Sequence, residues 1–191
     1  PLARLLAATI HSVPLYGSRI TPYTDGKSKM EALLAEIARA KRHIHIQYYI
    51  FCDDTTGCRL RDALVAKARQ GIEVRILYDD VGSSGAKKSF FRSMRSEGIE
   101  VYAFLHVKFP LFTSKVNYRN HRKIAVIDGC VGFLGGMNIA DRYVRGTEWG
   151  SWRDTHFRIE GSGAAGLQAS FLSDWSATCL LYTSPSPRDI S

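Results

Sequence analysis

The sequence Gly-Ile-Glu-Val occurs twice, at residues 71–74 and 98–101, and it constrains the fold more than any other feature of the chain. Each copy follows a segment with helical periodicity and opens an apolar run, "IEVRILYDD" and "IEVYAFL". Glycine ends helices well because it tolerates the left-handed backbone conformation found after the last helical turn. The repeat therefore predicts two transitions of the same kind, from a helix into a buried strand.

The neighbouring segments extend this alternation of helices and strands. Residues 27–42 carry apolar side chains at helical spacing, with Ser28 and Glu31 in the spacing of an N-terminal capping box. The run "HIHIQYYIF" alternates and is rich in β-formers, which predicts a strand. Two further helices are predicted at 59–70 and about 87–96. The pattern favours an α/β sandwich with a mixed, largely parallel sheet.

The chain length allows one substantial domain, because 191 residues with 45% hydrophobic content do not comfortably build two cores. We expect a lead-in segment at 1–19, a globular domain at 20–178 and a tail at 179–191. Residues 179–189 match, residue for residue, one reading frame of a transposon-type sequencing-library adapter. The tail shows neither helical nor strand periodicity and is interpreted as artefactual or disordered, with a natural Ser/Pro-rich linker as the alternative.

The formal net charge of +8 does not depend on the tail, which holds one Arg and one Asp. Such an excess favours an anionic partner, either acidic lipid or nucleic acid, although a basic soluble surface also accounts for it. No run approaches the roughly 20 apolar residues that span a bilayer, and no signal peptide is visible. The visible chain is therefore expected to be soluble or to lie on a surface.

Cysteine and histidine usage argues against a zinc site. Outside the tail, Cys52, Cys58 and Cys130 form no C-x-x-C pair, which is typical of a reduced, cytosolic setting. His43 and His45 share one face of their predicted strand, but no carboxylate or thiol nearby completes a ligand set. We interpret both histidines as ordinary strand residues.

The stretch "NHRKIAVIDGCVGFLGGMN" carries the chemistry of the chain. In a strand, residues two apart share a face, so His121 and Lys123 should emerge side by side while the apolar residues after them anchor the strand. An imidazole next to a fixed ammonium suits attack on, or protonation of, a phosphate ester. The glycines of "GFLGGMN" permit close backbone approach, and the Asn138 amide is a donor for a phosphoryl oxygen.

A loop is predicted at 106–119, "HVKFPLFTSKVNYR", where proline, aromatic and basic residues interrupt the pattern before the motif. Its apolar side chains are candidates for either a lipid interface or core packing: Phe109, Leu111 and Phe112.

The stretch "NHRKIAVIDGCVGFLGGMN" resembles the phospholipase D superfamily, whose signature is His-x-Lys-x4-Asp followed by Gly-Gly/Ser-x-Asn. The signature is matched without a gap by His121, Lys123, Asp128, Gly135, Gly136 and Asn138. The segments "HIHIQYYIF", "VRILYDDVGS", "GGMNIADRY" and "WRDTHFRIEG" narrow the resemblance to the bacterial cardiolipin synthases, over roughly residues 20–178. The resemblance implies a phospholipase D-like α/β/α sandwich that forms one half of a two-lobed enzyme, with 20–178 as its catalytic domain.

The resemblance also implies roles for individual residues. His121 would be the nucleophile that forms a phosphatidyl-histidine intermediate, while Lys123 and Asn138 hold the non-bridging oxygens and Gly136 lines the substrate site. Neither a metal nor another cofactor is required, because fixed donors supply the electrostatic role that Mg²⁺ has in other phosphoryl transfers.

Two acidic residues complete the candidate site. Asp128 belongs to the catalytic signature, yet along a strand it would lie about 17 Å from Lys123, which favours structural pairing near the strand end. Asp154 in "WRDTHFRIEG" is expected to orient the His121 imidazole, since the superfamily places an acid at this strand. The alternative for Asp154 is an ordinary salt bridge at the start of a strand.

The function that this resemblance implies is cardiolipin synthesis, the transfer of phosphatidyl from one phosphatidylglycerol to another, at the cytoplasmic face or periphery of the bacterial inner membrane. The alternatives are a phospholipase D, a phosphodiesterase or nuclease, and an inactive fragment or membrane-binding module. The expected partners are phosphatidylglycerol, an anionic membrane, and a missing C-terminal catalytic half or a second copy, but not nucleic acid. We expect a second His-x-Lys-x4-Asp motif downstream in the intact gene, and no activity from this chain alone.

Overall fold

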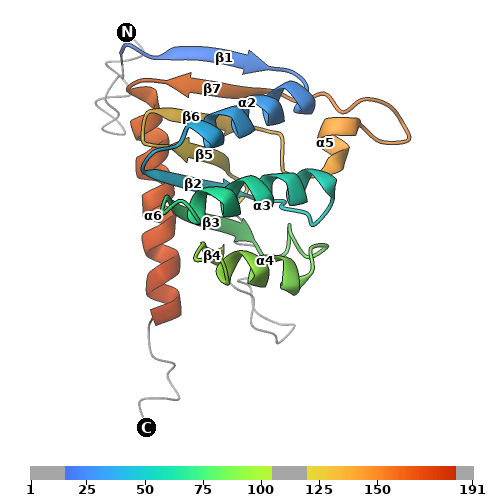
Figure 1. Ribbon diagram of the computed structural model, residues 1–191. Helices are drawn as coiled ribbons and strands as arrows, with labels where there is room; N and C mark the ends of the chain where they lie inside the picture. The colour runs from blue at the N-terminus through green and yellow to red at the C-terminus, as the bar shows by residue number, and fades with distance from the viewer. Residues whose placement is uncertain (1–15, 105–119, 184–191) are drawn as a thin grey trace.

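The computed structural model describes residues 16–104 and 120–183, with the backbone alone for 181–183. A seven-stranded sheet has the order β1-β7-β6-β5-β2-β3-β4 (Figure 1). In chain order the elements are β1 (Arg19–Tyr23), α2 (Gly26–Arg39), β2 (His43–Tyr48), α3 (Thr55–Ala68), β3 (Glu73–Asp79), α4 (Lys88–Arg95), β4 (Glu100–Phe104), β5 (Lys123–Ile127), β6 (Val131–Gly135), α5 (Asp141–Arg145), β7 (His156–Glu160) and α6 (Gly163–Thr183). The predicted loop at 106–119 and its apolar candidates lie outside the described residues.

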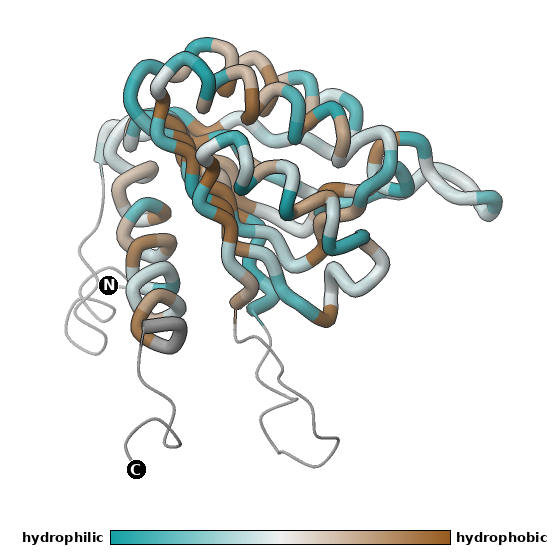
Figure 2. The backbone as a smooth tube through the Cα atoms, turned by 60° about the horizontal axis from the view of Figure 1, so that its bottom comes forward, coloured by the Kyte–Doolittle hydropathy of each residue, from teal (hydrophilic) through white to brown (hydrophobic). Residues whose placement is uncertain are grey.

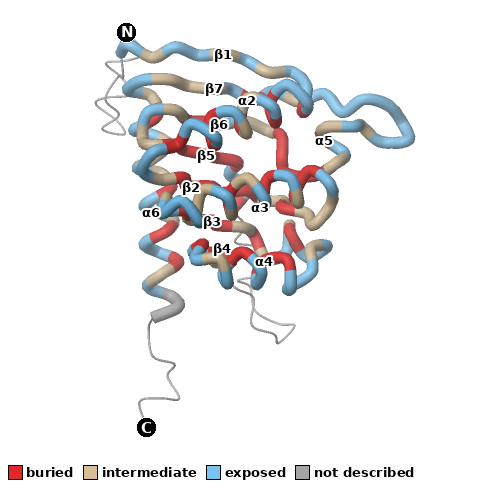
Figure 3. Tube along the Cα trace, viewed as in Figure 1, coloured by how far each residue is buried: buried red, intermediate tan, exposed pale blue. Residues whose placement is uncertain are grey.

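The sheet lies between two layers of helices, which confirms the predicted α/β/α sandwich. Helices α2, α3 and α4 cover one face and α6 covers the other (Figure 2). The larger core lies between the sheet and the three-helix layer, and its members include Leu33, Ile46 and Leu64. A smaller cluster of Leu77, Phe171 and Trp175 fixes α6. Burial is concentrated in the central strands β2 and β5, whereas the edge strand β1 is largely exposed (Figure 3).

The direction of the strands differs in part from the prediction. Strands β2, β3 and β4 are parallel and are joined through α3 and α4, as the repeated Gly-Ile-Glu-Val predicts. The other ladders, β2–β5, β5–β6, β6–β7 and β1–β7, are antiparallel, so the expectation of a largely parallel sheet is wrong. For β5 and β6 the cause is their connection of three residues, 128–130, which is too short for the crossover that parallel strands need.

The sequence predicts where helices end better than where they begin. Gly71 and Gly98 both have φ +82°, which confirms the two predicted helix stops. The capping box predicted at Ser28 is wrong, because Asp25 caps α2 by accepting a hydrogen bond from the Ser28 amide at 2.8 Å. Asp54 caps α3 in the same way, so that helix begins four residues earlier than predicted.

Helix α6 extends beyond the expected domain boundary at residue 178. It continues to Thr183, so residues 179–183 are helical although their sequence has no helical periodicity, and the expectation of disorder is wrong for them. Adding a residue to an existing helix is much easier than nucleating one, and the first proline of the tail comes later, at Pro185. The artefactual origin of the tail stays an interpretation. Among the described helices, α6 included, none combines the length and apolarity needed to cross a membrane.

A buried basic cluster lies between α2 and the sheet. Lys29 is 0% exposed, and its Nζ lies 4.6 Å from the centroid of the Tyr48 ring and 3.6 Å from the sulfur of Met30. Burial lowers the pKa of Lys29 to about 7. His156 lies buried beside this group, and burial, with the nearby charges of Lys29 and Lys123, lowers its pKa to about 2. The cluster therefore keeps its imidazole neutral and makes protonation of Lys29 costly.

We predict that replacing Lys29 with Met stabilises the fold. The unfolded chain holds a proton on this lysine up to pH about 10.5, whereas the folded chain loses it near pH 7. Between these values the free energy of unfolding should rise with pH, by up to about 1.4 kcal/mol per unit. In urea titrations Lys29→Met should remove this rise and gain about 2–4 kcal/mol at pH 7. Lys27→Met, at an exposed neighbouring position, is the control. An unchanged pH slope in Lys29→Met would contradict the prediction.

Candidate active site

The signature residues other than Asp128 gather at one end of the strands, where β2 and β3 end and β5 begins. Lys123 opens β5 directly opposite Tyr48, the last residue of β2. On the other side of β5, Gly135 at the end of β6 pairs with His156 at the start of β7. At this edge, on the right in Figure 1, strands β1, β2, β3, β4 and β6 end while β5 and β7 begin, so side chains there can meet a ligand.

His121 and Lys123 lie side by side, as the spacing predicts. The Nζ of Lys123 lies 2.8 Å from Nδ1 of His121 and donates to the His121 carbonyl at 2.7 Å. The ring of Tyr49 supports both groups: its centroid is 4.4 Å from that of the imidazole and 5.3 Å from the lysine Nζ. Lys123 is 3% exposed, whereas His121 faces solvent. A fixed cation therefore stands behind an accessible imidazole.

The electrostatics favour a neutral imidazole beside an ammonium. Burial, and after it the charge of Lys123, lowers the pKa of His121, while Asp79 acts in the opposite direction. Burial also lowers the pKa of Lys123 to about 8, with Asp154 partly offsetting it. At neutral pH the imidazole is thus largely in its nucleophilic form, and the lysine is still mostly charged.

Asp174 on α6 holds the two residues that flank His121, and sequence analysis missed it. Its Oδ2 accepts hydrogen bonds from the Asn120 side chain at 2.8 Å, from Gln47 at 2.6 Å and from the guanidinium of Arg122. Asp174 thus ties the side chains on both sides of His121 to α6, and Gln47 of β2 shares the same oxygen. The available sequence signal was that Asp174 is the single charged residue of α6.

The glycine and asparagine of the signature have defined structural tasks. A methyl group on Gly136 would lie 2.1 Å from a carboxylate oxygen of Asp154, so only glycine leaves room for this acid. The Asn138 side chain is buried: its oxygen accepts from the Ile50 amide at 3.0 Å, and its nitrogen donates to the Tyr143 hydroxyl at 2.8 Å. One amide hydrogen of Asn138 remains for the predicted contact with phosphate.

Asp154 lies at the site, but not against the predicted histidine. The structure shows no hydrogen bond between the described side chains of Asp154 and His121. The Asp154 carboxylate instead accepts from the Thr155 amide at 2.7 Å and raises the pKa of Lys123 through its charge. The orienting role of Asp154 thus stays a prediction.

Asp128 lies at the opposite end of β5 from Lys123, and its place in the catalytic group stays a prediction. Its carboxylate accepts hydrogen bonds from the backbone amides of Lys41, Arg42 and His43, at 2.9, 2.8 and 3.0 Å. Burial opposes ionisation, but these bonds outweigh it and hold the pKa of Asp128 below its usual range. With φ +54° it also forms the β5–β6 turn together with Gly129 at +70°. The structural role expected from the strand geometry is confirmed.

The histidines of β2 face α6, on the other side of the sheet from Lys123. His43 Nε2 lies 3.0 Å from the Gln168 Oε1, and His45 Nε2 lies 3.0 Å from a Glu73 carboxylate oxygen. This confirms their interpretation as strand residues. In the part of the chain that the structure describes, no three His, Cys, Asp or Glu side chains are grouped as metal ligands.

The fold is that of the phospholipase D family. The structure superposes with a TM-score of 0.63 on Nuc from Salmonella typhimurium, a phospholipase D family member, at 19% identity over 85% of this chain and 95% of that chain. Residues 33–175 match the family model described as the PLD-like domain of cardiolipin synthase, and the chain belongs to this family.

Curated relatives have closely similar sequences. The chain is 42% identical over 175 residues to the major cardiolipin synthase ClsA of Bacillus subtilis, which covers 91% of this chain and 36% of that protein. It is 47% identical over 154 residues to a cardiolipin synthase of Oceanobacillus iheyensis, covering 80% of this chain and 32% of that protein. The chain thus spans about a third of the length of these relatives.

We predict that Asp174→Asn loosens the active-site backbone. Removing the charge weakens three hydrogen bonds at one oxygen, and we expect a loss of about 1.5–3 kcal/mol in the free energy of unfolding. Asp62→Asn, which alters an exposed pair with Arg61 on α3, should cost less than about 0.5 kcal/mol. Urea titration measures both values, and NMR line widths of the His121 ring report its mobility. Equal losses in the free energy of unfolding for the two substitutions would show that Asp174 does not hold the residues that flank His121.

Proposed function

We propose that this chain is the motif-bearing part of a cardiolipin synthase, which transfers a phosphatidyl group from one phosphatidylglycerol to the hydroxyl of another. The observation that carries the proposal is the accessible imidazole of His121, 2.8 Å from the buried ammonium of Lys123, in a chain of this family. The lysine supplies charge for a phosphodiester, and the imidazole supplies a nucleophile.

The proposed chemistry has two steps that balance. In the first, His121 attacks the phosphorus of phosphatidylglycerol, a phosphorus–nitrogen bond forms, and the bond to the glycerol oxygen breaks as that oxygen takes up a proton. In the second, a hydroxyl of another phosphatidylglycerol loses its proton, attacks the phosphorus and releases His121. Lys123 and the remaining amide hydrogen of Asn138 offset the charge on the non-bridging oxygens in both steps.

The proton for the leaving glycerol requires a second acid–base group. His121 is occupied as nucleophile in the first step and so is unable to act as the acid. The proposed partner is a further catalytic half or a second copy of this chain, facing the same sheet edge. The lipid substrate places the assembly at the bacterial inner membrane, on its cytoplasmic face or periphery.

The function is tested with phosphatidylglycerol vesicles and labelled lipid. The chain alone, as a demonstrated monomer, should form no cardiolipin, and activity should appear when a second catalytic half is supplied. His121→Ala should abolish transfer in the active assembly while changing the free energy of unfolding by less than about 1 kcal/mol. His43→Gln, on the opposite face of the sheet, should retain activity. Hydrolysis to phosphatidic acid without cardiolipin would indicate a phospholipase D, and cleavage of DNA would indicate a nuclease. Either result would contradict the proposed function.

The pH dependence of transfer should follow the two perturbed groups. The lowered pKa of His121 keeps the nucleophile neutral to lower pH than for an ordinary histidine, so the acidic limb of the rate profile should shift downward. On the alkaline side the rate should fall above pH about 8, as Lys123 loses its charge. A Lys123→Arg variant, which stays protonated, should lose this alkaline limb. An unchanged alkaline limb in that variant would contradict the assignment.

A further inference from the structure

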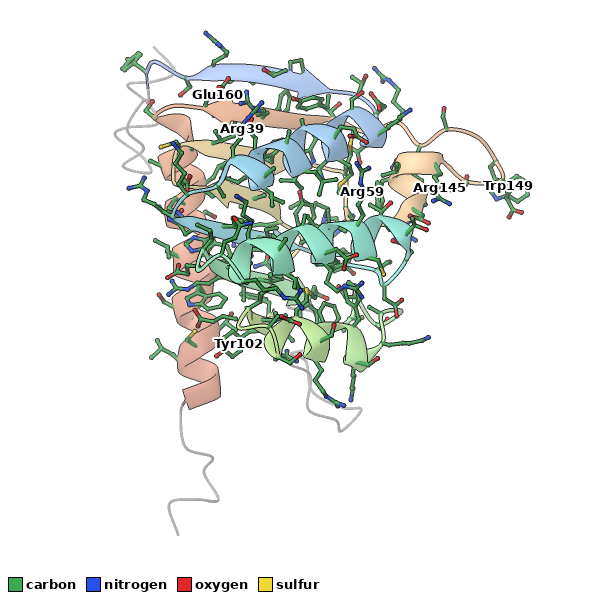
Figure 4. The ribbon with its side chains drawn as sticks, viewed as in Figure 1. Arg39, Arg59, Tyr102, Arg145, Trp149 and Glu160 are labelled. Carbon is green, nitrogen blue, oxygen red and sulfur yellow. The ribbon has the colours of Figure 1, made fainter. Side chains whose placement is uncertain are left out.

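A loop projects from the same sheet edge as the site. Residues 146–153, the tip loop, follow α5 and carry Trp149, whose exposed fraction of 90% is far above that of ordinary tryptophans. The side chain points away from the body of the molecule (Figure 4). Burying an indole is strongly favourable, so a tryptophan held in water indicates a surface that meets another phase or molecule.

The tip loop is a formed turn. The amide of Thr147 donates to the Gly150 carbonyl at 2.8 Å, and the Gly150 amide donates back to the Thr147 carbonyl at 3.1 Å. The Trp149 amide donates to the Thr147 hydroxyl at 3.3 Å. The backbone is thus arranged before binding, which reduces the entropy that docking would cost.

Exposed arginines lie on the tip loop and on the helix before it, while two of the nearby acids, Asp141 and Asp154, are partly buried. Three exposed arginines, Arg142, Arg145 and Arg153, lie on α5 and the tip loop, against one exposed acid in this region, Glu148. The Arg145 side chain is 63% exposed, and its guanidinium pairs with Asp141 at a long distance of 3.8 Å, which leaves it able to reach a phosphate. An indole among arginines is the chemistry that binds the headgroup region of an anionic bilayer.

The tip loop is also in physical contact with the site. Trp152 packs on Tyr143 with ring centroids 4.9 Å apart, and the Tyr143 hydroxyl accepts the hydrogen bond from Asn138. Docking of the loop would therefore place the signature asparagine and its neighbours close to the lipid surface.

We propose that Trp149 inserts into the headgroup region of an anionic phospholipid bilayer and holds the active-site edge against the membrane. The proposal rests on the lipid substrate proposed above. A bilayer fits the tip loop better than a protein partner does, because a stable protein interface needs about 800 Å² on each side, whereas this loop offers one projecting ring among charges.

The test measures partitioning of the chain into phosphatidylglycerol vesicles and into phosphatidylcholine vesicles by co-sedimentation. We expect binding to phosphatidylglycerol that weakens with salt, and about tenfold weaker partitioning for Trp149→Ala. Tyr16→Ala is the matched control, since Tyr16 is 81% exposed and precedes β1 at the opposite sheet edge; its partitioning should stay within about twofold of wild type. Vesicles of phosphatidylglycerol with brominated acyl chains should quench part of the tryptophan fluorescence of the wild type. Trp149→Ala should lack this quenched component.

The outcomes separate this inference from the proposed reaction, because binding is measured without turnover. If partitioning depends on Trp149 in a chain that forms no cardiolipin, the result supports membrane binding by the tip loop. The phosphatidyl transfer reaction is then decided by the separate activity assay. Equal partitioning of wild type and Trp149→Ala would overturn the inference, as would an absence of binding to phosphatidylglycerol. If Trp149→Ala abolished self-association in sedimentation experiments but left vesicle binding intact, the loop would be a protein contact and the proposal would be wrong.

Discussion

The antiparallel pairing of β5 with β2 is the contact on which the site depends. It joins a unit of alternating strands and helices, β2 to β4, to the strands that follow residue 120, and it sets Lys123 opposite Tyr48. Asp128 fixes the other end of this ladder through three backbone amides. A slip of one residue in this pairing would turn Lys123 to the α6 face of the sheet. By fixing one end of β5, Asp128 therefore sets the position of Lys123 at the other end.

The site combines basic groups that oppose one another's protonation. Lys29, Lys123 and His156 lie on the same side of the sheet, and the imidazole stays neutral because burial and two nearby lysines disfavour its charge. The accessible His121 is influenced in the same direction by Lys123. An arrangement that is costly in a folded protein would become useful with the phosphodiester substrate proposed above, because desolvated cations interact strongly with negative charge. Stability and anion binding therefore make opposite demands on these positions.

Local patterns predicted the parallel half of the fold and the central pair of the site. The helix stops at Gly71 and Gly98 and the adjacency of His121 and Lys123 depend on periodicity over a few residues, which sequence alone reveals. The antiparallel half depends on which strands meet, and β5 inserts beside β2, far away in sequence. Asp174 escaped notice for the same reason: it contacts Asn120, 54 positions away, and only the packing of α6 brings the two together.

The β2–β5 pairing also affects how the chain reaches its fold. His43 and Asp128 are 85 positions apart, so we expect this ladder to close after the more local contacts between β2, β3 and β4. As the chain emerges from the ribosome, β2 therefore presents one apolar edge with unpaired amides until β5 has been synthesised. Such an edge is a template for pairing with other chains. Early association with a chaperone would protect the strand against which Lys123 is later placed.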